Sequence, residues 1–159
     1  MIDVFKVKDF KSLVEVEVNL GLVNVFIGAN GSGKSNLPEA VGVLGVAASG
    51  RVDDESLMHC GVRPGRPALY KSSFKNKSTA PNIRFEAGEN GVSYAVSLVN
   101  PLEKQSPNWY YNSERLMTGQ EVLVERSPKI NNYLNPLAGL SPLEAVYLMP
   151  SSLSERTQK

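Results

Sequence analysis

The sequence has little of several features that define whole classes of protein. Its 159 residues include one cysteine, Cys60, so no disulfide can form within the chain and a disulfide-stapled secreted domain is excluded. The most apolar stretch, residues 40–48, is far shorter than the roughly 20 residues that a membrane-spanning helix needs. The formal net charge of +1 excludes a strongly basic nucleic-acid arm as the main theme. We therefore expect a cytoplasmic protein with no signal peptide and no membrane contact.

Metal-ligating residues are equally scarce. His59 stands beside Cys60, but the sequence holds no other histidine or cysteine to complete a site. We expect a loop or packing role for this pair. What the chain does have is 42% apolar and 21% charged residues, the composition of a folded globular protein. Its length predicts one domain, or one lobe of a larger domain.

The first part of the chain alternates with the period of strands. Apolar and charged residues alternate over 14–20 and, in a shorter run, over 5–8, and residues 9–13 would form the turn between these two strands. Residues 22–27 are nearly all apolar, which predicts a strand buried on both faces. Residues 36–48 follow as a helix that is apolar all round, weakened by Gly42 and Gly45.

The second half predicts an antiparallel meander of about four strands. Alternation returns over 82–87 and 92–98, with Gly88-Glu89-Asn90-Gly91 as the turn between them. Residues 109–116 and 121–126 would be the third and fourth strands. Residues 49–81 have no period and predict a loop with short elements at most. Residues 141–144 have the pattern of a helix start, and 146–149 fit either its continuation or a short buried strand.

One motif carries recognisable chemistry. Residues 28–35, Gly-Ala-Asn-Gly-Ser-Gly-Lys-Ser, match G-x-x-x-x-G-K-S without a gap. In such a loop the glycines let backbone N–H groups point at phosphate oxygens, and the next helix presents its positive end to the same anion. Lys34 would reach the β and γ phosphates, and the Ser35 hydroxyl would ligate Mg²⁺. A glycine-rich surface turn is the alternative; the apolar strand before the loop and the helix after it favour phosphate binding.

Pro38 fits this helix badly. It falls about one turn inside, where proline removes a backbone donor and crowds the carbonyl four residues earlier. An interior proline costs about 3 kcal/mol, and much less if it lies in the first turn.

The order of these elements resembles a known family. A strand, Asp9-Phe10-Lys11-Ser12, a second strand and then residues 25–36 are similar to the N-terminal lobe of ABC-type ATPases of the chromosome-maintenance and recombination-repair class. The closest resemblance is to the predicted-ATPase branch that includes the overcoming-lysogenization-defect nucleases. The meander resembles that class's β-subdomain. The resemblance covers most of residues 1–150, and its motif-level part covers 9–44.

This resemblance implies an α/β fold of the P-loop NTPase type with an antiparallel β-subdomain. Residues 1–159 would be the N-terminal part of one ATPase domain: 1–48 with the phosphate loop, 82–126 as the meander and 127–159 as a return segment. It implies ATP and Mg²⁺ as ligands. The residues implied at the phosphates are Gly28, Asn30, Gly31, Ser32, Gly33, Lys34 and Ser35, with Asn36 near the α phosphate.

Two further residues are implied at the nucleotide. By the resemblance, Lys11 would reach the nucleotide or a nucleic-acid backbone; a solvated turn lysine is an equal alternative. The segment near the γ phosphate would fall at residues 151–156, which makes Arg156 a weaker candidate.

The chain also departs from the family. It has no apolar run ending in Asp-Glu to hold Mg²⁺ and polarise water, and no Leu-Ser-Gly-Gly signature. Asp53-Asp54-Glu55 follows a polar segment and indicates a solvated loop. In the family the missing elements belong to a C-terminal lobe. We therefore expect an ATP-binding lobe that pairs with that lobe or with a second copy, has DNA as a possible partner, and hydrolyses ATP poorly by itself.

Two other functions stay open at this stage. A small P-loop kinase or GTPase is disfavoured by the strands ahead of the loop and by the lack of an Asn-Lys-x-Asp guanine reader. A non-catalytic nucleotide-binding interaction module is the other. Among the remaining residues, Lys71, Lys75 and Lys77 with Phe74 fit nucleic-acid contact or, more simply, a solvated loop. The aromatic residues 109–111 fit base stacking or, more simply, packing.

Overall fold

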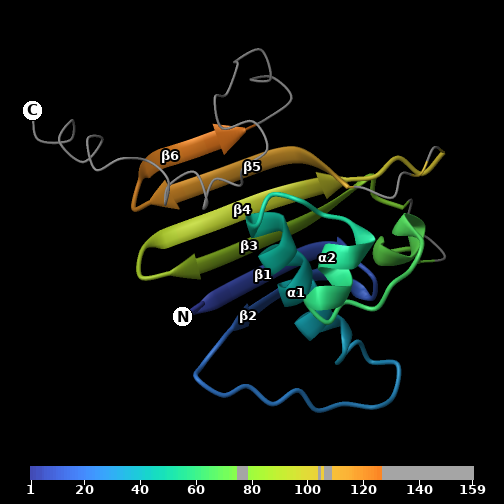
Figure 1. Ribbon diagram of the computed structural model, residues 1–159. Helices are drawn as coiled ribbons and strands as arrows, with labels where there is room; N and C mark the ends of the chain where they lie inside the picture. Colours follow the sequence, from blue (N-terminus) through green and yellow to red (C-terminus); the bar gives the residue numbers. More distant parts are fainter. Residues whose placement is uncertain (75–78, 104, 106–108, 127–159) are drawn as a thin grey trace, which may run out of the picture.

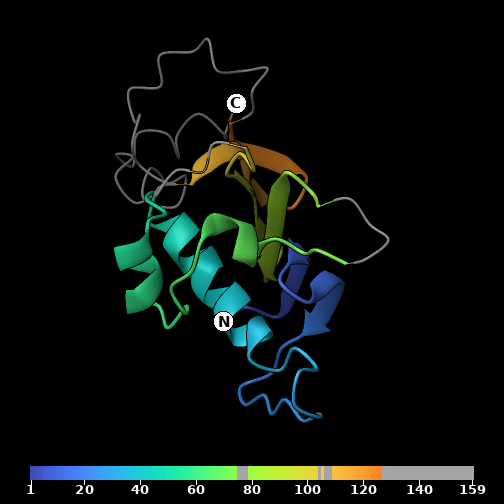
Figure 2. The same ribbon diagram turned by 90° about the vertical axis from the view of Figure 1, so that its right-hand side faces the viewer.

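The computed structural model describes residues 1–74, 79–103, 105 and 109–126. One six-stranded antiparallel sheet carries the helices on one face (Figures 1 and 2). The strand pairs of the described residues are all antiparallel, so the α/β fold of the P-loop NTPase type stays a prediction. The strand order is β2-β1-β3-β4-β5-β6. The strands are β1 (Val4–Phe10), β2 (Leu13–Asn19), β3 (Asn82–Glu89), β4 (Val92–Val99), β5 (Tyr110–Thr118) and β6 (Glu121–Arg126). The helices are α1 (Asn36–Ala48), α2 (Asp54–His59) and the 3-10 turn η1 (Pro67–Tyr70).

Several predictions fall outside the described residues. They are Lys75, Lys77, Arg156, the helix start at 141–144, the segment 146–149 and the return segment 127–159.

Six of the predicted strands are confirmed, all but the one over residues 22–27, and they join into a single sheet. β1 pairs with β2 on one side and with β3 on the other, so the N-terminal hairpin continues directly into the meander. Val7 faces Phe85, which faces Val96, so one buried row runs across three strands. The turn between β3 and β4 has two residues, Asn90 and Gly91, both at positive φ. This geometry explains the Asn-Gly pair, because both residues tolerate the left-handed region.

The core lies between the sheet and α1. Helix α1 contacts β1 and β3 and buries a large part of its surface, as its all-round apolar sequence predicts. The buried core residues include Phe5, Val7, Ala40, Val43, Leu44, Ala47, Ile83, Phe85, Tyr94, Val96 and Leu98. Pro38 is the third residue of α1, where backbone N–H groups have no helical partner, so the interior penalty does not apply.

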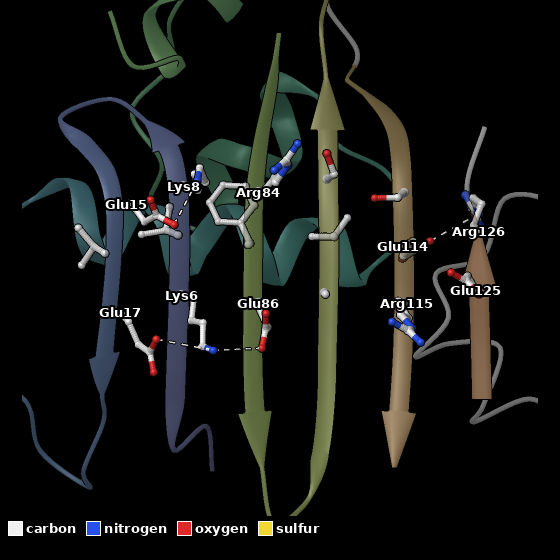
Figure 3. A pocket seen from close by; sticks show the side chains of 17 residues that line it. Lys6, Lys8, Glu15, Glu17, Arg84, Glu86, Glu114, Arg115, Glu125 and Arg126 are labelled. Carbon is white, nitrogen blue, oxygen red and sulfur yellow. Dashed lines mark hydrogen bonds and ion pairs between the residues drawn. The ribbon is translucent and has the colours of Figure 1, made fainter. Parts of the chain in front are cut away.

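The other face of the sheet is charged (Figure 3). Lys6 lies 3.6 Å from both Glu17 and Glu86, and Lys8 donates to Glu15 at 3.1 Å. Along β2, β1 and β3, charged residues on this face alternate with apolar residues on the core face, which explains the period-two pattern of the sequence. Among the described residues, no helix is long and apolar enough to cross a bilayer.

The predicted buried strand over residues 22–27 is wrong for this chain as described. No strand forms there, and Leu22, Val23, Val25 and Ile27 are between 77% and 90% exposed. Figures 1 and 2 show the segment running away from the sheet, between β2 and α1. A strand that is apolar on both faces needs a neighbouring strand and cover on each face. None of the described residues supplies them.

Two polar predictions are also wrong. Asp53 is not a solvated loop residue, because it caps α2 by accepting a 2.9 Å hydrogen bond from the Ser56 N–H and is 6% exposed. The hydrogen bond from the Ser56 backbone holds the pKa of Asp53 below its usual value.

Lys71 is not solvated either. It is 3% exposed, and its ammonium donates to the Asn100 carbonyl and lies 5.9 Å from the Trp109 ring centroid. Burial lowers the pKa of Lys71. Trp109 is buried in the core as the packing interpretation predicts.

Candidate functional site

The Gly-rich loop, residues 28–35, connects the exposed segment 22–27 to α1. Its lysine folds back across the loop: the Lys34 ammonium donates to the Ala29 carbonyl at 2.7 Å. The same carbonyl accepts from the Ser32 N–H at 3.2 Å. The loop therefore wraps around the ammonium group of its own lysine, so that a cation lies inside the turn of the loop. Asn30 lies at its exposed outer side.

The glycines of the loop are required by its shape. Gly31 and Gly33 have φ of +83° and +93°, in the region where side chains are strained. A Cβ on Gly33 would lie 2.5 Å from the Ser12 Oγ, and one on Gly28 would lie 2.7 Å from the Ser32 Oγ. The loop thus rests directly on the β1–β2 turn at Ser12. This contact brings Lys11, the neighbour of Ser12, to the loop.

The first turn of α1 carries the next two predicted residues. Ser35 stands at the helix N-cap, and its side chain makes no capping hydrogen bond. The Asn36 amide donates to the Ser12 Oγ at 2.8 Å. Within the described residues no group of three or more His, Cys, Asp and Glu side chains could hold a metal. A free serine hydroxyl at a phosphate loop fits Mg²⁺, which binds through few protein ligands, with waters and substrate phosphates completing its shell.

A charged cluster lies beside this turn. The carboxylate of Glu39, in the first turn of α1, is 5% exposed and accepts from both the Lys11 ammonium and the Arg63 Nε. The Lys11 side chain is 15% exposed, so the solvated-turn alternative is wrong. The Arg63 Nη2 also lies 3.4 Å from the Asn36 Oδ1. Two cations and one carboxylate leave the cluster with one net positive charge beside the loop.

Sequence reasoning missed Glu39 and Arg63. An acid in the first turn of the helix after a phosphate loop was visible, but an anion there argues against phosphate binding unless its cationic partners are known. Arg63 lies in a segment with no period, and nothing local distinguishes it from Arg66. Only the folded chain brings residues 11, 39 and 63 together.

The other predicted residues do not join this site. Asp54 and Glu55 lie in the first turn of α2, and the exposed Cys60 ends that helix. The hollow of about 390 Å³ in Figure 3 lies on the charged face of the sheet, opposite α1. Its floor includes Ala95, Ser97 and Ser113, and it is separate from the loop.

Comparisons with known proteins give short but clear similarity. The chain is 45% identical over 53 residues to the DNA replication and repair protein RecF of Halothermothrix orenii, and 45% identical over 49 residues to RecF of Paenarthrobacter aurescens. The matches cover 33% and 30% of this chain, and only 14% and 12% of the relatives. No protein-family model matches the chain.

One solved chain, from a study of ATP-driven dimerization and DNA-stimulated activation of SMC ATPases, aligns with a TM-score of 0.47 and 17% identity. The alignment covers 99% of this chain and 91% of the solved chain. The RecF matches support the resemblance to the recombination-repair class of ABC-type ATPases and a related nucleotide-binding role. The overcoming-lysogenization-defect branch stays a prediction.

Proposed function

We propose that this chain is the ATP-binding N-terminal lobe of an ABC-type ATPase, with residues 28–35 wrapped around the phosphates of ATP. The observation that carries the proposal is the curl of the loop around the Lys34 ammonium, 2.7 Å from the Ala29 carbonyl. A triphosphate oxygen is a stronger acceptor for an ammonium than a neutral carbonyl. On binding, the lysine would exchange that carbonyl for phosphate, with little movement of the loop.

The remaining predicted residues have roles that suit this pose. Backbone N–H groups of residues 30–35 would meet the phosphates at the positive end of α1, with the Ser32 N–H exchanging the Ala29 carbonyl for a phosphate oxygen. The Ser35 hydroxyl, which caps nothing, would be the protein ligand of Mg²⁺, and the cation would neutralise charge on the phosphates. The Asn36 amide is held at the loop by Ser12. The net positive cluster at Lys11 would face the nucleotide.

The exposed segment 22–27 supports the second half of the proposal, a missing lobe. Four apolar side chains that are more than three-quarters exposed mark a surface that another segment covers. We propose that a C-terminal lobe supplies the neighbouring strands and the acid that activates water. ATP would then drive pairing of two such units, by themselves or on DNA. Because the matches span so little of the relatives, the partners and the process are proposals.

Calorimetric titration of ATP with Mg²⁺ into the purified chain tests the nucleotide site. Lys34→Ala should weaken binding by at least about 30-fold, because charge-assisted contacts are worth roughly 2–3 kcal/mol. Lys6→Ala is the matched control, since Lys6 is an exposed cation on the opposite face of the sheet, paired only with glutamates. Its affinity should equal that of the wild type.

Three outcomes would contradict the proposal. The wild-type chain could show no binding, Lys34→Ala could bind as well as the wild type, or both lysine variants could lose affinity equally. Far-ultraviolet circular dichroism of each variant checks that the fold is kept.

A further inference from the structure

Tyr70 contacts both basic residues of the cluster beside the phosphate loop, Lys11 through its ammonium and Arg63 through its backbone carbonyl. It ends η1 and is 2% exposed. Its ring centroid lies 5.0 Å from the Lys11 ammonium, within the range of a cation–π contact. Its hydroxyl donates to the Arg63 carbonyl at 2.8 Å. Tyr70 therefore contacts both of the residues that pair with Glu39. It comes from a segment whose sequence has no period.

The ring itself is rigidly held. Phe10 stacks on it with a centroid distance of 6.3 Å, and Trp109 meets it edge-on at 5.9 Å. The backbone adds a further tie, because the Lys11 N–H donates to the Tyr70 carbonyl at 2.9 Å. Lys11 adopts a φ of +47°, a strained value for lysine, and this hydrogen bond helps to hold it there. A fixed ring restricts the Lys11 ammonium to a small volume.

The Tyr70 hydroxyl matters for a different reason. Glu39 would neutralise Lys11 if the two formed a simple pair, and a neutralised lysine attracts an anion weakly. Arg63 shares the same carboxylate, and the hydroxyl of Tyr70 anchors the Arg63 backbone from which that side chain extends. Burial raises the pKa of Tyr70, so the hydroxyl keeps its proton and remains a donor. The hydroxyl thereby helps to keep one positive charge uncompensated at the loop.

We propose that Tyr70 is a positioning residue of the nucleotide site: its ring fixes the ammonium of Lys11 toward the bound phosphates, and its hydroxyl keeps Arg63 on Glu39. The inference rests on the proposed function, since it assigns Tyr70 a role in that same site. It predicts that Tyr70 affects ATP affinity through Lys11, and it separates the contribution of the ring from that of the hydroxyl.

The test is a set of ATP titrations with Mg²⁺ on the wild type, on variants of Tyr70 with and without Lys11→Gln, on Lys11→Gln alone and on a control variant. Tyr70→Leu should weaken binding about tenfold and Tyr70→Phe about threefold, because phenylalanine keeps the ring and loses only the hydroxyl. In a Lys11→Gln background, Tyr70→Leu should cause little further loss. Tyr110→Leu is the control, because Tyr110 is a 54% exposed tyrosine away from Lys11 and should leave affinity unchanged.

The outcomes separate the two ideas. If the wild type binds ATP and Lys34→Ala does not, the nucleotide site stands. Equal losses from Tyr70→Leu with and without Lys11 would then overturn the positioning role alone, because a purely structural effect does not depend on Lys11. If Tyr70→Leu does not fold, Tyr70→Phe in both backgrounds decides: the threefold loss must persist with Lys11 and shrink without it. Wild-type affinity in Tyr70→Phe would overturn the role of the hydroxyl.

Discussion

At the residue scale, the two loop glycines that have positive φ differ in what surrounds them. Gly31 and Gly33 both have positive φ, but a Cβ on Gly31 would meet open space, whereas one on Gly33 would overlap the Ser12 Oγ at 2.5 Å. Gly31→Ala should therefore add only backbone strain, about 1–2 kcal/mol. Gly33→Ala should also push the loop off the β1–β2 turn and weaken ATP binding more strongly. Titration of both variants measures this difference.

Removing the overlap should rescue the second variant in part. Ser12→Ala combined with Gly33→Ala takes away the hydroxyl oxygen that the new methyl group meets. The double variant should bind ATP more tightly than Gly33→Ala alone. Equal affinity for Gly31→Ala and Gly33→Ala would show that the loop does not rest on Ser12 in solution.

A second residue-scale prediction concerns Glu114, a 1% exposed carboxyl on the core side of β5. The Tyr94 hydroxyl donates to it at 2.6 Å, and the Arg126 Nε lies 3.6 Å away (Figure 3). Burial raises the pKa of Glu114 to about 7, above its usual 4.5. Between those pH values the unfolded chain releases this proton and the folded chain keeps it. The free energy of unfolding should therefore fall as pH rises, by up to about 3 kcal/mol.

Urea unfolding of the wild type and Glu114→Gln at pH 5 and pH 8 isolates this contribution. Glutamine keeps an acceptor for Tyr94 and cannot ionise. The stability of the variant relative to the wild type should rise between pH 5 and pH 8. Parallel pH dependence of the two proteins would mean that Glu114 ionises normally in the folded state.

The sequence predicts the candidate roles of residues inside the motif. It does not predict the roles of residues whose partners lie far away in the sequence. The G-x-x-x-x-G-K-S spacing indicates Lys34 and Ser35 without any structure. Lys11 and Lys71 look like solvated residues from their neighbours in sequence. Their actual partners are the carboxylate of Glu39, 28 residues away, and a carbonyl 29 residues away. The local pattern contains no information about such partners. Asp53 differs, because its partner is the N–H of Ser56, three residues away in the helix that it caps.

At the element scale, helix α1 contains two glycines with opposite surroundings. A Cβ on Gly45 would meet nothing within 4 Å, whereas one on Gly42 would lie 2.6 Å from the Cys60 carbonyl. Gly45→Ala should stabilise the chain by about 1 kcal/mol, because glycine inside a helix costs that much relative to alanine. Gly42→Ala should destabilise it by roughly 1–3 kcal/mol through overpacking.

Thermal or urea unfolding of the two variants, side by side, tests the packing of α1. Both changes raise helix propensity equally, so only the tertiary contact with the end of α2 distinguishes them. Stabilisation by both alanines would mean that α1 and Cys60 are not in contact. Position within α1 also explains why Pro38 is tolerated, because the N–H groups of the first helical turn have no helical partner to lose.

The elements that could be predicted are the strands that bury one face only, because apolar and polar residues then alternate along their sequence. Period-two alternation located β1, β2 and β3, because in these strands the more buried apolar side chains alternate with more exposed polar or charged ones. The joining of β1 to β3 was not predictable, since 71 residues of other structure separate β1 from β3. Residues 22–27 mark the opposite case. Their sequence requires cover on both faces, and the described part of the chain offers cover on neither.

At the scale of the whole molecule, the sheet supports the phosphate loop at one end only. The β1–β2 turn holds the loop through Ser12, and α1 fixes its far side. The segment that enters the loop, residues 22–27, has no packing of its own. A C-terminal lobe, when supplied, should therefore pack against residues 22–27 as well as complete the site. Slower hydrogen exchange of the backbone amides of residues 22–27 would show this packing.

The last prediction is that this chain binds ATP but barely hydrolyses it. Phosphoryl transfer to water needs a group that orients the nucleophile, besides the loop that holds the phosphates. Among the described acids, Asp53 caps α2, Glu39 is occupied by two cations, and Glu114 lies across the core. Absence of one such group typically lowers the rate by orders of magnitude while binding survives.

Phosphate release at saturating ATP should therefore stay near background for the wild-type chain and for Lys34→Ala alike. It should rise only for the wild type when a C-terminal lobe of an ABC-type ATPase is added in trans. This pairing of variants ties any activity to the loop, because a contaminating ATPase would ignore the Lys34 substitution. Robust turnover by the chain alone, lost in Lys34→Ala, would overturn the half-site interpretation. The acid would then have to come from this chain, and Asp54 and Glu55, exposed in the first turn of α2 and engaged in no cap, would be the first to substitute.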